Sequence, residues 1–356
     1  MNLTEDEYAV VALDCFERLE YKNKAAIFSS VSRPSEILND SGVIERCLNK
    51  NAYNNVSELL RDRAAMDECV SRATSGIDGV ITLYSEDYPE ELKSTPVPPL
   101  AIYYKGNREL LKSKYKFAIV GSRKTTEPYR AKAREISSRL SESGITIVTG
   151  IAEGGDRAVI DGAMTSGNLI SVFAGGIDCV YPAVHVHLAE KIAENGLIIS
   201  EYPCTVAPKF YTFPVRNRII AGLCGGALIL SGSMNSGTRH TAGYALDYGR
   251  ELAVLPYGLG AQGELCKHLL KSGAALVENA DDVASLMGYK LENARKITLT
   301  DNENKIYSII KGGAAETDEI IFKSKMPIGE VINSLTTLEM KGFISKDLGS
   351  LYSTLK

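Results

Sequence analysis

The sequence lacks several features by which whole classes of protein are recognised. It has no tryptophan and only 4 histidines in 356 residues. No apolar run reaches the roughly 18 residues that a membrane-spanning helix needs. The first residues, NLTEDEYAVVALD after Met1, are acidic, whereas a secretory signal begins with basic residues. We therefore expect a cytoplasmic protein that makes no use of a membrane.

Motifs for nucleotide, metal and nucleophile chemistry are also scarce. The chain has no G-x-x-x-x-G-K-[ST] phosphate loop and no G-x-S-x-G nucleophile turn. Its 7 cysteines include no C-x-x-C pair, and we interpret them as reduced thiols. Gly258–Gly263 matches G-x-G-x-x-G, but it follows the last long strand, whereas a dinucleotide fingerprint follows the first. His185 and His187, with Cys179 nearby, lack a second ligand pair. We expect no cofactor, no metal and no catalytic residue.

Charge is spread unevenly along a chain of otherwise ordinary composition. The length suggests two or three domains, and the 44% hydrophobic and 24% charged residues are normal for a globular protein. Residues 1–99 hold 10 basic and 18 acidic side chains, whereas residues 105–139 hold 11 basic and 3 acidic ones. A polyanionic ligand, if the protein has one, is expected in the middle of the chain.

The middle of the chain has the pattern of an α/β domain. From Phe117 onward, short apolar runs that end near Gly or Ser alternate with helical stretches, and these runs are FAIVGS, ITIVTG, LISVFAGG, LIISEY, ALILSG and ELAVLPYG. Strands that are apolar throughout and alternate with helices predict a Rossmann-like, doubly wound parallel sheet covered on both faces. Ligands of such sheets bind at the carboxyl ends of the strands.

Two smaller domains are predicted on either side of the sheet. The N-terminal region has amphipathic, helix-length stretches at about residues 5–20, 24–31, 42–50 and 55–73. A lead-in segment with two β-type runs follows, at residues 80–84 and 100–104. The C-terminal region has three short helices and a hairpin with a Gly turn, a winged-helix pattern. The predicted domains are a small helical, SAM-like domain (1–75), the Rossmann-like core with its lead-in (76–290) and a winged-helix-like domain (296–356).

The third helix of the C-terminal domain, from Pro327 to about Met340, bears on what that domain does. It places on one face Ile328, Val331, Ile332, Leu335 and Leu338. We expect this face to be used up in the domain's own core. The other face has no Lys or Arg, which a recognition helix in the major groove needs near phosphates. We therefore predict a protein-contact or regulatory module, not a sequence-specific duplex binder.

Two turns after predicted strands resemble anion sites. Gly121–Lys124 follows the first strand and combines a tight turn, a hydroxyl, a guanidinium and a helix that starts near Pro128, which together suit a phosphate. The alternative is that the turn only connects strand and helix and that Arg123 is solvated. Ser233–Thr241 follows a later strand with a similar composition, so both turns are expected on the same rim of the sheet.

Residues 207–222, here called the basic–aromatic segment, carry the most information about function. The segment interleaves Lys209, Arg216 and Arg218 with Phe210, Tyr211 and Phe213. Cations for the backbone and aromatic faces for the bases suit single-stranded nucleic acid. The alternative is that one or two aromatics anchor the loop in the core and that Arg218 pairs with an acidic neighbour such as Glu201.

The motifs FAIVGSR, TGIAEGGD, AGGIDCVYP, LIISEYP, FPVRNRIIAGL and SGSMNSGTRHTA, in this order, resemble the DNA-processing protein A (DprA/Smf) family of bacteria. EDYPEEL and PPLAIYYKG upstream, and the tail, extend the resemblance. It implies a non-enzymatic protein that binds single-stranded DNA without sequence preference. It also implies loading of the recombinase RecA onto that DNA, in natural transformation (competence) or recombination, by a homodimer formed through the Rossmann-like domain.

The resemblance and the turns together give a predicted DNA-binding set. By resemblance, the turn at 121–123 is the family's phosphate-binding turn, and residues between 209 and 218 are its DNA-contacting segment. Two departures matter: Glu153 stands where the family commonly has an arginine, and Arg239 adds a cation. The predicted residues are Gly121, Ser122, Arg123, Lys124, Lys209, Phe213, Arg216, Asn217, Arg218, Ser236, Gly237, Thr238 and Arg239.

The main alternative function is a nucleotide-processing hydrolase of related Rossmann-like architecture. The lysine-decarboxylase-like phosphoribohydrolases carry P-G-G-x-G-T-x-x-E, whose glutamate supplies the catalytic carboxylate. The corresponding stretch here is Met234–Thr241, with Thr241 in place of the glutamate.

We therefore predict no hydrolysis of nucleoside monophosphates or ATP, because neither a phosphate loop nor that glutamate is present. The check is to incubate the purified protein with nucleoside monophosphates or ATP and to measure the phosphate or free base released. Turnover that survives purification and is lost on replacing Arg239 or Asp156 would assign the protein to the enzymes instead.

Overall fold

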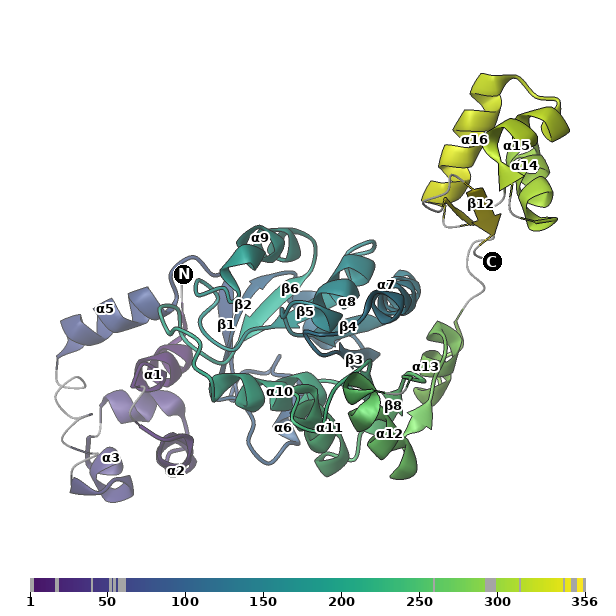
Figure 1. Ribbon diagram of the computed structural model, residues 1–356. Coiled ribbons are helices and arrows are strands. Elements are labelled where there is room, and N and C mark those ends of the chain that lie inside the picture. Colours follow the sequence, from purple (N-terminus) through teal and green to yellow (C-terminus); the bar gives the residue numbers. More distant parts are fainter. Residues whose placement is uncertain are drawn as a thin grey trace. The chain divides into compact units, whose positions relative to one another are not determined.

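The computed structural model describes residues 3–16, 19–39, 41–50, 53, 56, 62–258, 260–291, 299–313, 315–341, 343–346 and 351–354. The chain divides into two compact units, Met1–Glu292 and Asn293–Lys356 (Figure 1). No helix in these ranges is both long and apolar enough to cross a bilayer.

A nine-stranded sheet forms the centre of the larger unit, with the strand order β1-β2-β6-β5-β4-β3-β7-β8-β9. The strands are β1 Gly79–Thr82, β2 Ala101–Gly106, β3 Lys116–Val120, β4 Thr146–Thr149, β5 Leu169–Val172, β6 Leu197–Ser200, β7 Gly226–Ile229, β8 Glu251–Val254 and β9 Ala275–Leu276. From β6 to β9 all neighbours are parallel. The predicted α/β fold with a doubly wound parallel sheet is therefore confirmed. The lead-in strands β1 and β2 extend the same sheet in antiparallel fashion beyond β6.

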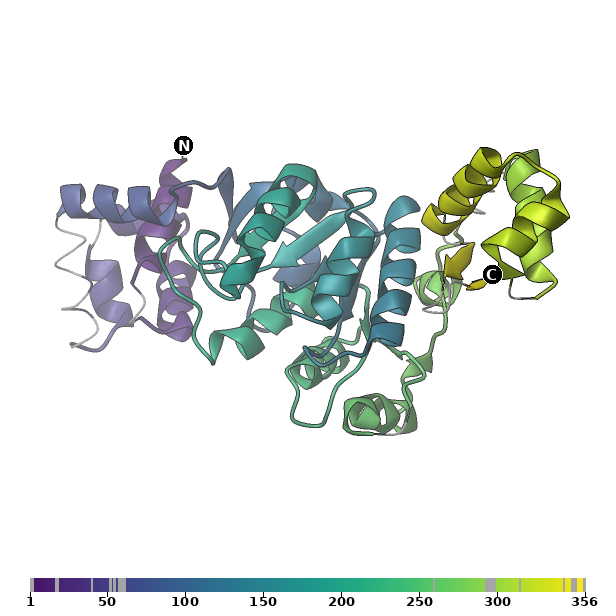
Figure 2. The ribbon, with the colours of Figure 1, turned by 45° about the horizontal axis from the view of Figure 1, so that its top comes forward.

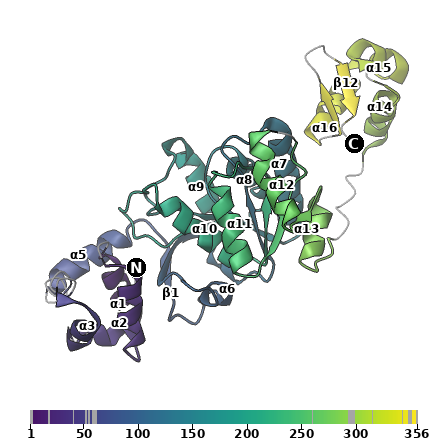
Figure 3. The ribbon, with the colours of Figure 1, turned by 60° about the horizontal axis from the view of Figure 1, so that its bottom comes forward.

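Helices cover both faces of this sheet (Figures 1 and 3). One face carries α7 Glu127–Glu142, α8 Gly155–Ala163 and α9 Val186–Asn195, and the other carries α6 Glu90–Lys93, α10 Thr212–Gly222, α11 Thr238–Asp247 and α12 Glu264–Lys271; α13 Ala280–Leu286 packs near α7. Alternate residues of β3 show the consequence. Phe117 and Ile119 lie in the hydrophobic core with α7 and α8, whereas Ala118 and Val120 lie in the core with α10 and α11.

Helices form in the N-terminal region where they were predicted, although the first ends earlier and the last begins later than expected, and they pack beside β1 and β2 (Figure 2). They are α1 Glu5–Asp14, α2 Tyr21–Ser29, α3 Ser41–Cys47 and α5 Arg63–Ala73. Polar contacts add to the apolar packing: the Tyr103 hydroxyl on β2 donates to Asp14 Oδ2 at 3.0 Å, and Lys24 pairs with Asp14 at 3.0 Å. The helices thus share one compact unit with the sheet, and their separation as a domain of residues 1–75 stays a prediction.

The smaller unit has the three helices that the sequence predicted and the two paired strands of the predicted hairpin, whose Gly turn lies outside the described residues. Its elements are α14 Asp301–Lys311, β10 Ala315–Glu316, α15 Thr317–Ser324, α16 Ile328–Met340, β11 Ile344–Lys346 and β12 Leu351–Thr354, with the antiparallel strand order β10-β12-β11. Its core includes Ile306, Ile310 and Ile320 from the first two helices. The assignment as a winged helix stays a prediction.

One expectation about this unit is wrong: the apolar face of α16 is not used up in the core. Val331, Leu335 and Leu338 are buried, but Ile328 and Ile332 are 60% and 51% exposed. At about 100° per residue, Ile332 points roughly 100° away from Val331 around the helix. The small unit therefore covers only a narrow stripe of α16 and leaves the neighbouring stripe uncovered.

This difference predicts unequal effects of two alanine substitutions. Leu335→Ala should lower the free energy of unfolding of the smaller unit by about 2–5 kcal/mol, because it opens a cavity. Ile332→Ala should lower it by less than about 1 kcal/mol, because half of the side chain is already in solvent. Amide hydrogen exchange of α14 in the full chain reports opening of this unit. Similar losses of protection in both variants would contradict the burial pattern.

Candidate nucleic-acid interface

The strand order changes direction at β3, since β4 follows β3 on one side and β7 lies on the other. The loops that leave β3 and β7 meet there, as expected for a ligand site in a doubly wound sheet. The Ser122 amide donates to both the carbonyl and the hydroxyl oxygen of Ser231, each at 3.3 Å. The hydroxyls of Thr125 and Ser231 are 2.6 Å apart. The turn after β3 is thus fixed to the chain after β7.

Two glycines and a carboxylate hold the turn after β4 against the turn after β3. A Cβ on Gly155 would lie 2.4 Å from the Cα of Gly121, so only glycine permits this approach. The amides of Gly121 and Ala152 both donate to Asp156, each at 3.3 Å. Burial raises the pKa of the Asp156 carboxyl above its ordinary value, while the positive charge of Arg216 opposes the rise. Asp156 is therefore part of the scaffold of the site.

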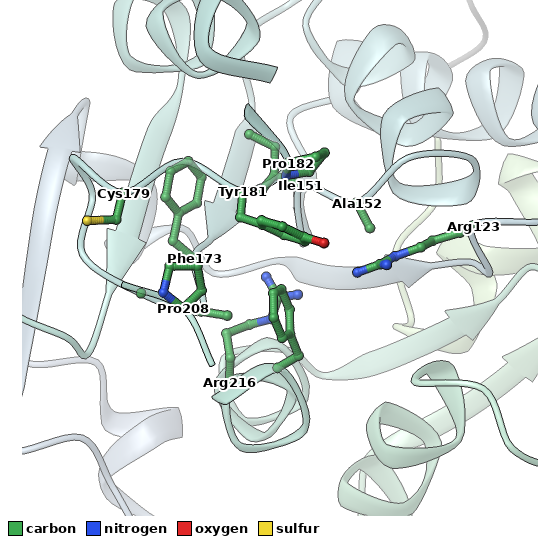
Figure 4. Close-up of a pocket in the computed structure, with 12 residues that line it drawn as sticks. Arg123, Ile151, Ala152, Phe173, Cys179, Tyr181, Pro182, Pro208 and Arg216 are labelled. Carbon is green, nitrogen blue, oxygen red and sulfur yellow. The ribbon is translucent and has the colours of Figure 1, made fainter. Parts of the chain in front are cut away.

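Arg123 leaves this junction and lies beside a pair of aromatic rings. Its guanidinium carbon is 5.9 Å from the centre of the Tyr181 ring and 6.0 Å from that of Phe213, and these rings meet edge to face at 5.5 Å. Both distances are within the range of cation–π attraction. Together with Arg216 these side chains converge on a small pocket at the ends of β4 and β5 (Figure 4).

The pocket is too small for a nucleotide in this conformation. Its free volume is about 20 Å³, which is room for about one water molecule. Arg123 is exposed and Tyr181 is 48% exposed, so both side chains can rotate without disturbing the core. A base or phosphate would therefore bind over the pocket or displace one of these two side chains.

Three residues of the predicted DNA-binding set point into the protein. Arg216 is buried, donates to the carbonyl oxygen of Val172 and donates to Asn217 Oδ1 at 3.1 Å. Burial lowers the pKa of its guanidinium to about 10. Arg218 is buried in an ion pair with Glu201, which is the pairing that the alternative interpretation named. Asn217 donates to the carbonyl oxygen of Gly237 at 3.1 Å and so ties α10 to the loop before α11.

Other predicted residues face solvent around the same rim. Lys124, Lys209 and Arg239 are exposed. Phe210, which was not in the predicted set, is 93% exposed, and Tyr211 is exposed beside it. Phe213 is half-buried against Tyr181. Together with Arg123 and Tyr181, the rim therefore presents four exposed cations and three exposed aromatic rings.

The turn before α11 is built from interlocking hydroxyls. The Ser236 and Thr238 hydroxyls are 2.6 Å apart, and the Thr238 hydroxyl donates to the Ser231 carbonyl at 3.3 Å. A Cβ on Gly232 would lie 2.4 Å from the Thr238 hydroxyl, so the turn is tightly packed. Gly237 carries the carbonyl that Asn217 holds. This turn reaches the same edge of the sheet as Gly121–Lys124, and it places Arg239 at the end of the rim.

The basic stretch at 105–139 does not form one surface, because β3 passes through it. Residues 105–116 precede or begin β3 and lie at the amino edge of the sheet, opposite the rim; Lys116 is buried and pairs with Glu91 at 2.9 Å. Arg123 and Lys124 follow β3 and lie at the carboxyl edge. Of these two groups, only the second can take part in a site at the rim.

The structure adds residues that were not in the predicted DNA-binding set. Phe173, Cys179, Tyr181 and Pro208 line the pocket with Arg123. For Cys179 and Tyr181 the available signal was the run AGGIDCVYP, which follows a predicted strand and therefore had to reach the same edge of the sheet.

No cluster of His, Cys, Asp and Glu that suits a metal ion occurs among the residues that the structure describes. His185 is buried with Nδ1 2.8 Å from the carbonyl oxygen of Ile151, and His187 contacts Glu190 at the surface. Both histidines are therefore explained by contacts within the protein.

Comparison with known proteins places this arrangement in a family. The sequence model of DNA recombination-mediator protein A matches residues 79–288. Protein Smf from Synechocystis is 30% identical over 308 residues, which cover 75% of this chain and 77% of that protein. The chain belongs to the DNA recombination-mediator protein A family. The matched region spans the sheet and every turn of the rim.

Solved structures of the family extend the similarity to three dimensions. The X-ray structure of DNA processing protein A from Streptococcus pneumoniae covers 83% of this chain and 100% of its own, with a TM-score of 0.69 and 27% identity. That from Helicobacter pylori, described for its unique single-stranded DNA binding mode, covers 59% and 97%, with a TM-score of 0.54 and 29% identity. This family member therefore shares its fold with a protein studied for binding single-stranded DNA.

The scaffold role of Asp156 gives a prediction about stability. Asp156→Asn should lower the free energy of unfolding by about 3 kcal/mol, because it leaves the charge of Arg216 buried without its counter-charge. Asp161→Asn on the same helix should cost less than about 1 kcal/mol, because Asp161 pairs with the part-exposed Arg157. Urea unfolding followed by circular dichroism measures both. Equal costs would show that Asp156 does not hold the site together.

Proposed function

We propose that the protein binds single-stranded DNA without sequence preference across the rim formed by the turns at 121–124, 207–213 and 236–239. The observation that carries this proposal is the guanidinium of Arg123 lying against two aromatic rings at the switch point of the sheet, with Lys124 on the same turn and Lys209 and Arg239 on the adjoining segments. Cations bind the backbone and ring faces stack on any base, so this combination gives affinity without sequence reading.

The buried members of the predicted set have a different part in this proposal. Arg216, Asn217 and Arg218 would fix the position of α10 and of the loop before it, whereas Arg123, Lys124, Lys209 and Arg239 would meet phosphates. Arg216 also lines the pocket, so a group that displaced Tyr181 would reach its charge. Phe213, with Tyr181, would keep Arg123 oriented toward the bound DNA strand. Phe210 would offer a ring face to a base.

The resemblance supports a larger role, in which the DNA-bound protein loads the recombinase RecA during natural transformation or related recombination in the cytoplasm. We propose this role, with a homodimer as the active form. The sheet offers one site for a second copy at β9, an edge strand whose Leu276 is 53% exposed. A pairing of edge strands would cover this side chain.

The hydrolase alternative gains nothing from the structure. Thr241, which stands where that enzyme class carries its glutamate, is buried. Threonine has no carboxylate to act as the catalytic acid. Because the position is buried, a side chain there would also not face the rim.

The proposal predicts how charge substitutions at the rim alter binding. Arg123→Ala and Lys209→Ala should each weaken binding about tenfold for oligo-dT, oligo-dA and mixed strands alike. With about three of these four cations on phosphates at one time, the log–log salt slope should be near −2 in the wild type and less steep by about 0.7 in each variant. Fluorescence titration with labelled strands at several salt concentrations measures both quantities.

Lys112→Ala is the matched control. Lys112 belongs to the same basic stretch but precedes β3, at the opposite edge of the sheet, and it pairs with Glu109 at 2.9 Å. Its replacement should leave affinity and salt slope unchanged. An Arg123→Ala, Lys209→Ala double variant that binds as tightly as the wild type would sink the proposed site.

A further inference from the structure

A strained residue lies just before the exposed part of the basic–aromatic segment. Thr205, in the loop between β6 and α10, has φ 74°, in the left-handed region that a β-branched residue rarely adopts. Such a conformation persists only where the surrounding structure imposes it. The contacts around Thr205 should therefore show what imposes it.

One carboxylate supplies the direct restraint. The Thr205 amide donates to both Oδ1 and Oδ2 of Asp178, each at 2.9 Å. Asp178 comes from the loop after β5, in the AGGIDCVYP run. A Cβ on Gly176 would lie 2.6 Å from Asp178 Oδ1, so the glycine leaves the space in which this carboxylate turns back toward Thr205.

The residues on either side of Thr205 are fixed by separate contacts. The Cys204 amide donates to the carbonyl oxygen of Ala73, at the end of α5, at 3.0 Å. The Gly176 amide donates to the carbonyl oxygen of Val206 at 2.8 Å. Cys204 and Val206 are both buried. The chain therefore enters and leaves Thr205 at fixed points, and the turn at Thr205 sets the direction in which the following residues run.

Those following residues are the exposed part of the rim. Pro208 packs so closely on Gly175 that a Cβ there would lie 2.8 Å from it. Lys209 then begins a turn in which its amide donates to the Thr212 hydroxyl at 3.0 Å, and Phe210 stands out into solvent. A change of conformation at Thr205 would move Lys209 and Phe210 relative to Arg123.

We propose that Asp178 is a positioning residue for single-stranded DNA binding: its carboxylate holds Thr205 in the left-handed conformation and so places Lys209 and Phe210 beside Arg123. This inference rests on the proposed function, because it assigns a role within the same site. Electrostatics alone gives the opposite expectation, since a negative charge near a DNA site repels phosphate. Removal of Asp178 should therefore weaken DNA binding if the residue positions the loop, and should tighten binding if only its charge matters.

The experiment titrates labelled oligo-dT into the full chain at fixed salt. Asp178→Ala should weaken binding several-fold although it removes a negative charge. Asp178→Asn keeps an acceptor for the Thr205 amide and should bind at least as tightly as the wild type. Adding Thr205→Gly to Asp178→Ala should recover most of the lost affinity, because glycine adopts φ 74° without help.

Glu153→Ala is the matched control for charge. Glu153 is an exposed acid on the neighbouring loop, after β4, and its removal should tighten binding, because it takes one negative charge from the rim. The contrast with Asp178→Ala isolates the effect of the restraint on Thr205. Circular dichroism of each variant shows whether it is folded.

The outcomes distinguish the inference from the proposed function. A wild type that does not bind single strands overturns the proposed function itself. A wild type that binds, with Asp178→Ala binding equally or more tightly, overturns the positioning role alone. The same holds if the Thr205→Gly, Asp178→Ala double variant is folded but as weak as Asp178→Ala. If Asp178→Ala alone is unfolded, the Thr205→Gly, Asp178→Ala double variant decides. Recovery of folding and of DNA binding in that double variant supports the positioning role. A folded double variant that binds as weakly as Arg123→Ala contradicts it.

Discussion

The close contact between the turns after β3 and β4 is the constraint on which the rim depends. Gly121 and Gly155 approach each other more closely than any side chain allows, and Asp156 accepts hydrogen bonds from both turns. Asp156 also provides the negative charge near Arg216. Arg123 follows the turn after β3, and Arg216 comes from α10. The buried Asp156 carboxylate therefore sets the spacing between this turn and α10, which are far apart in the sequence.

Charged side chains at this site fall into two groups: one is buried and stabilises the fold, and the other is exposed at the rim. Asp156, Arg216 and Arg218 are buried and Glu201 is largely buried, where charges cost free energy unless they are paired, and their contacts fix α10 and its loop. Lys124, Lys209 and Arg239 are exposed on turns that these contacts hold. In the proposed function, affinity comes from the second group and geometry from the first. Under this proposal, replacing a member of either group would weaken DNA binding, but only replacements in the first group would also lower stability.

This division marks the limit of what the sequence could predict. The strands, their parallel order and the edge at which their turns meet followed from apolar runs that end in glycine or serine, because that pattern reports burial directly. The direction of each cation did not follow, because Arg216, Asn217 and Arg218 form a continuous polar run, which a solvent-facing segment would also show. Their partners, Asp156 and Glu201, are distant in the sequence, and only the folded sheet brings them near. For Arg218 the residues left both interpretations open, and the structure selects the buried one.

The exposure of Ile328 and Ile332 on α16 is a second feature that the sequence pattern could not predict. An apolar helical face predicts that something covers it, but the width of the covered stripe depends on how many elements pack on the helix, which the pattern of one helix does not contain. Thr205 shows the converse at the rim. Nothing in CTVAPKF predicts a left-handed residue, since the restraint comes from Asp178 on another loop. In the proposed function, a basic and aromatic run indicates which residues would meet DNA, whereas the acid that orients the run comes from elsewhere in the chain. An acidic side chain would then favour a polyanion, because its hydrogen bonds to a backbone amide fix the positions of the cations.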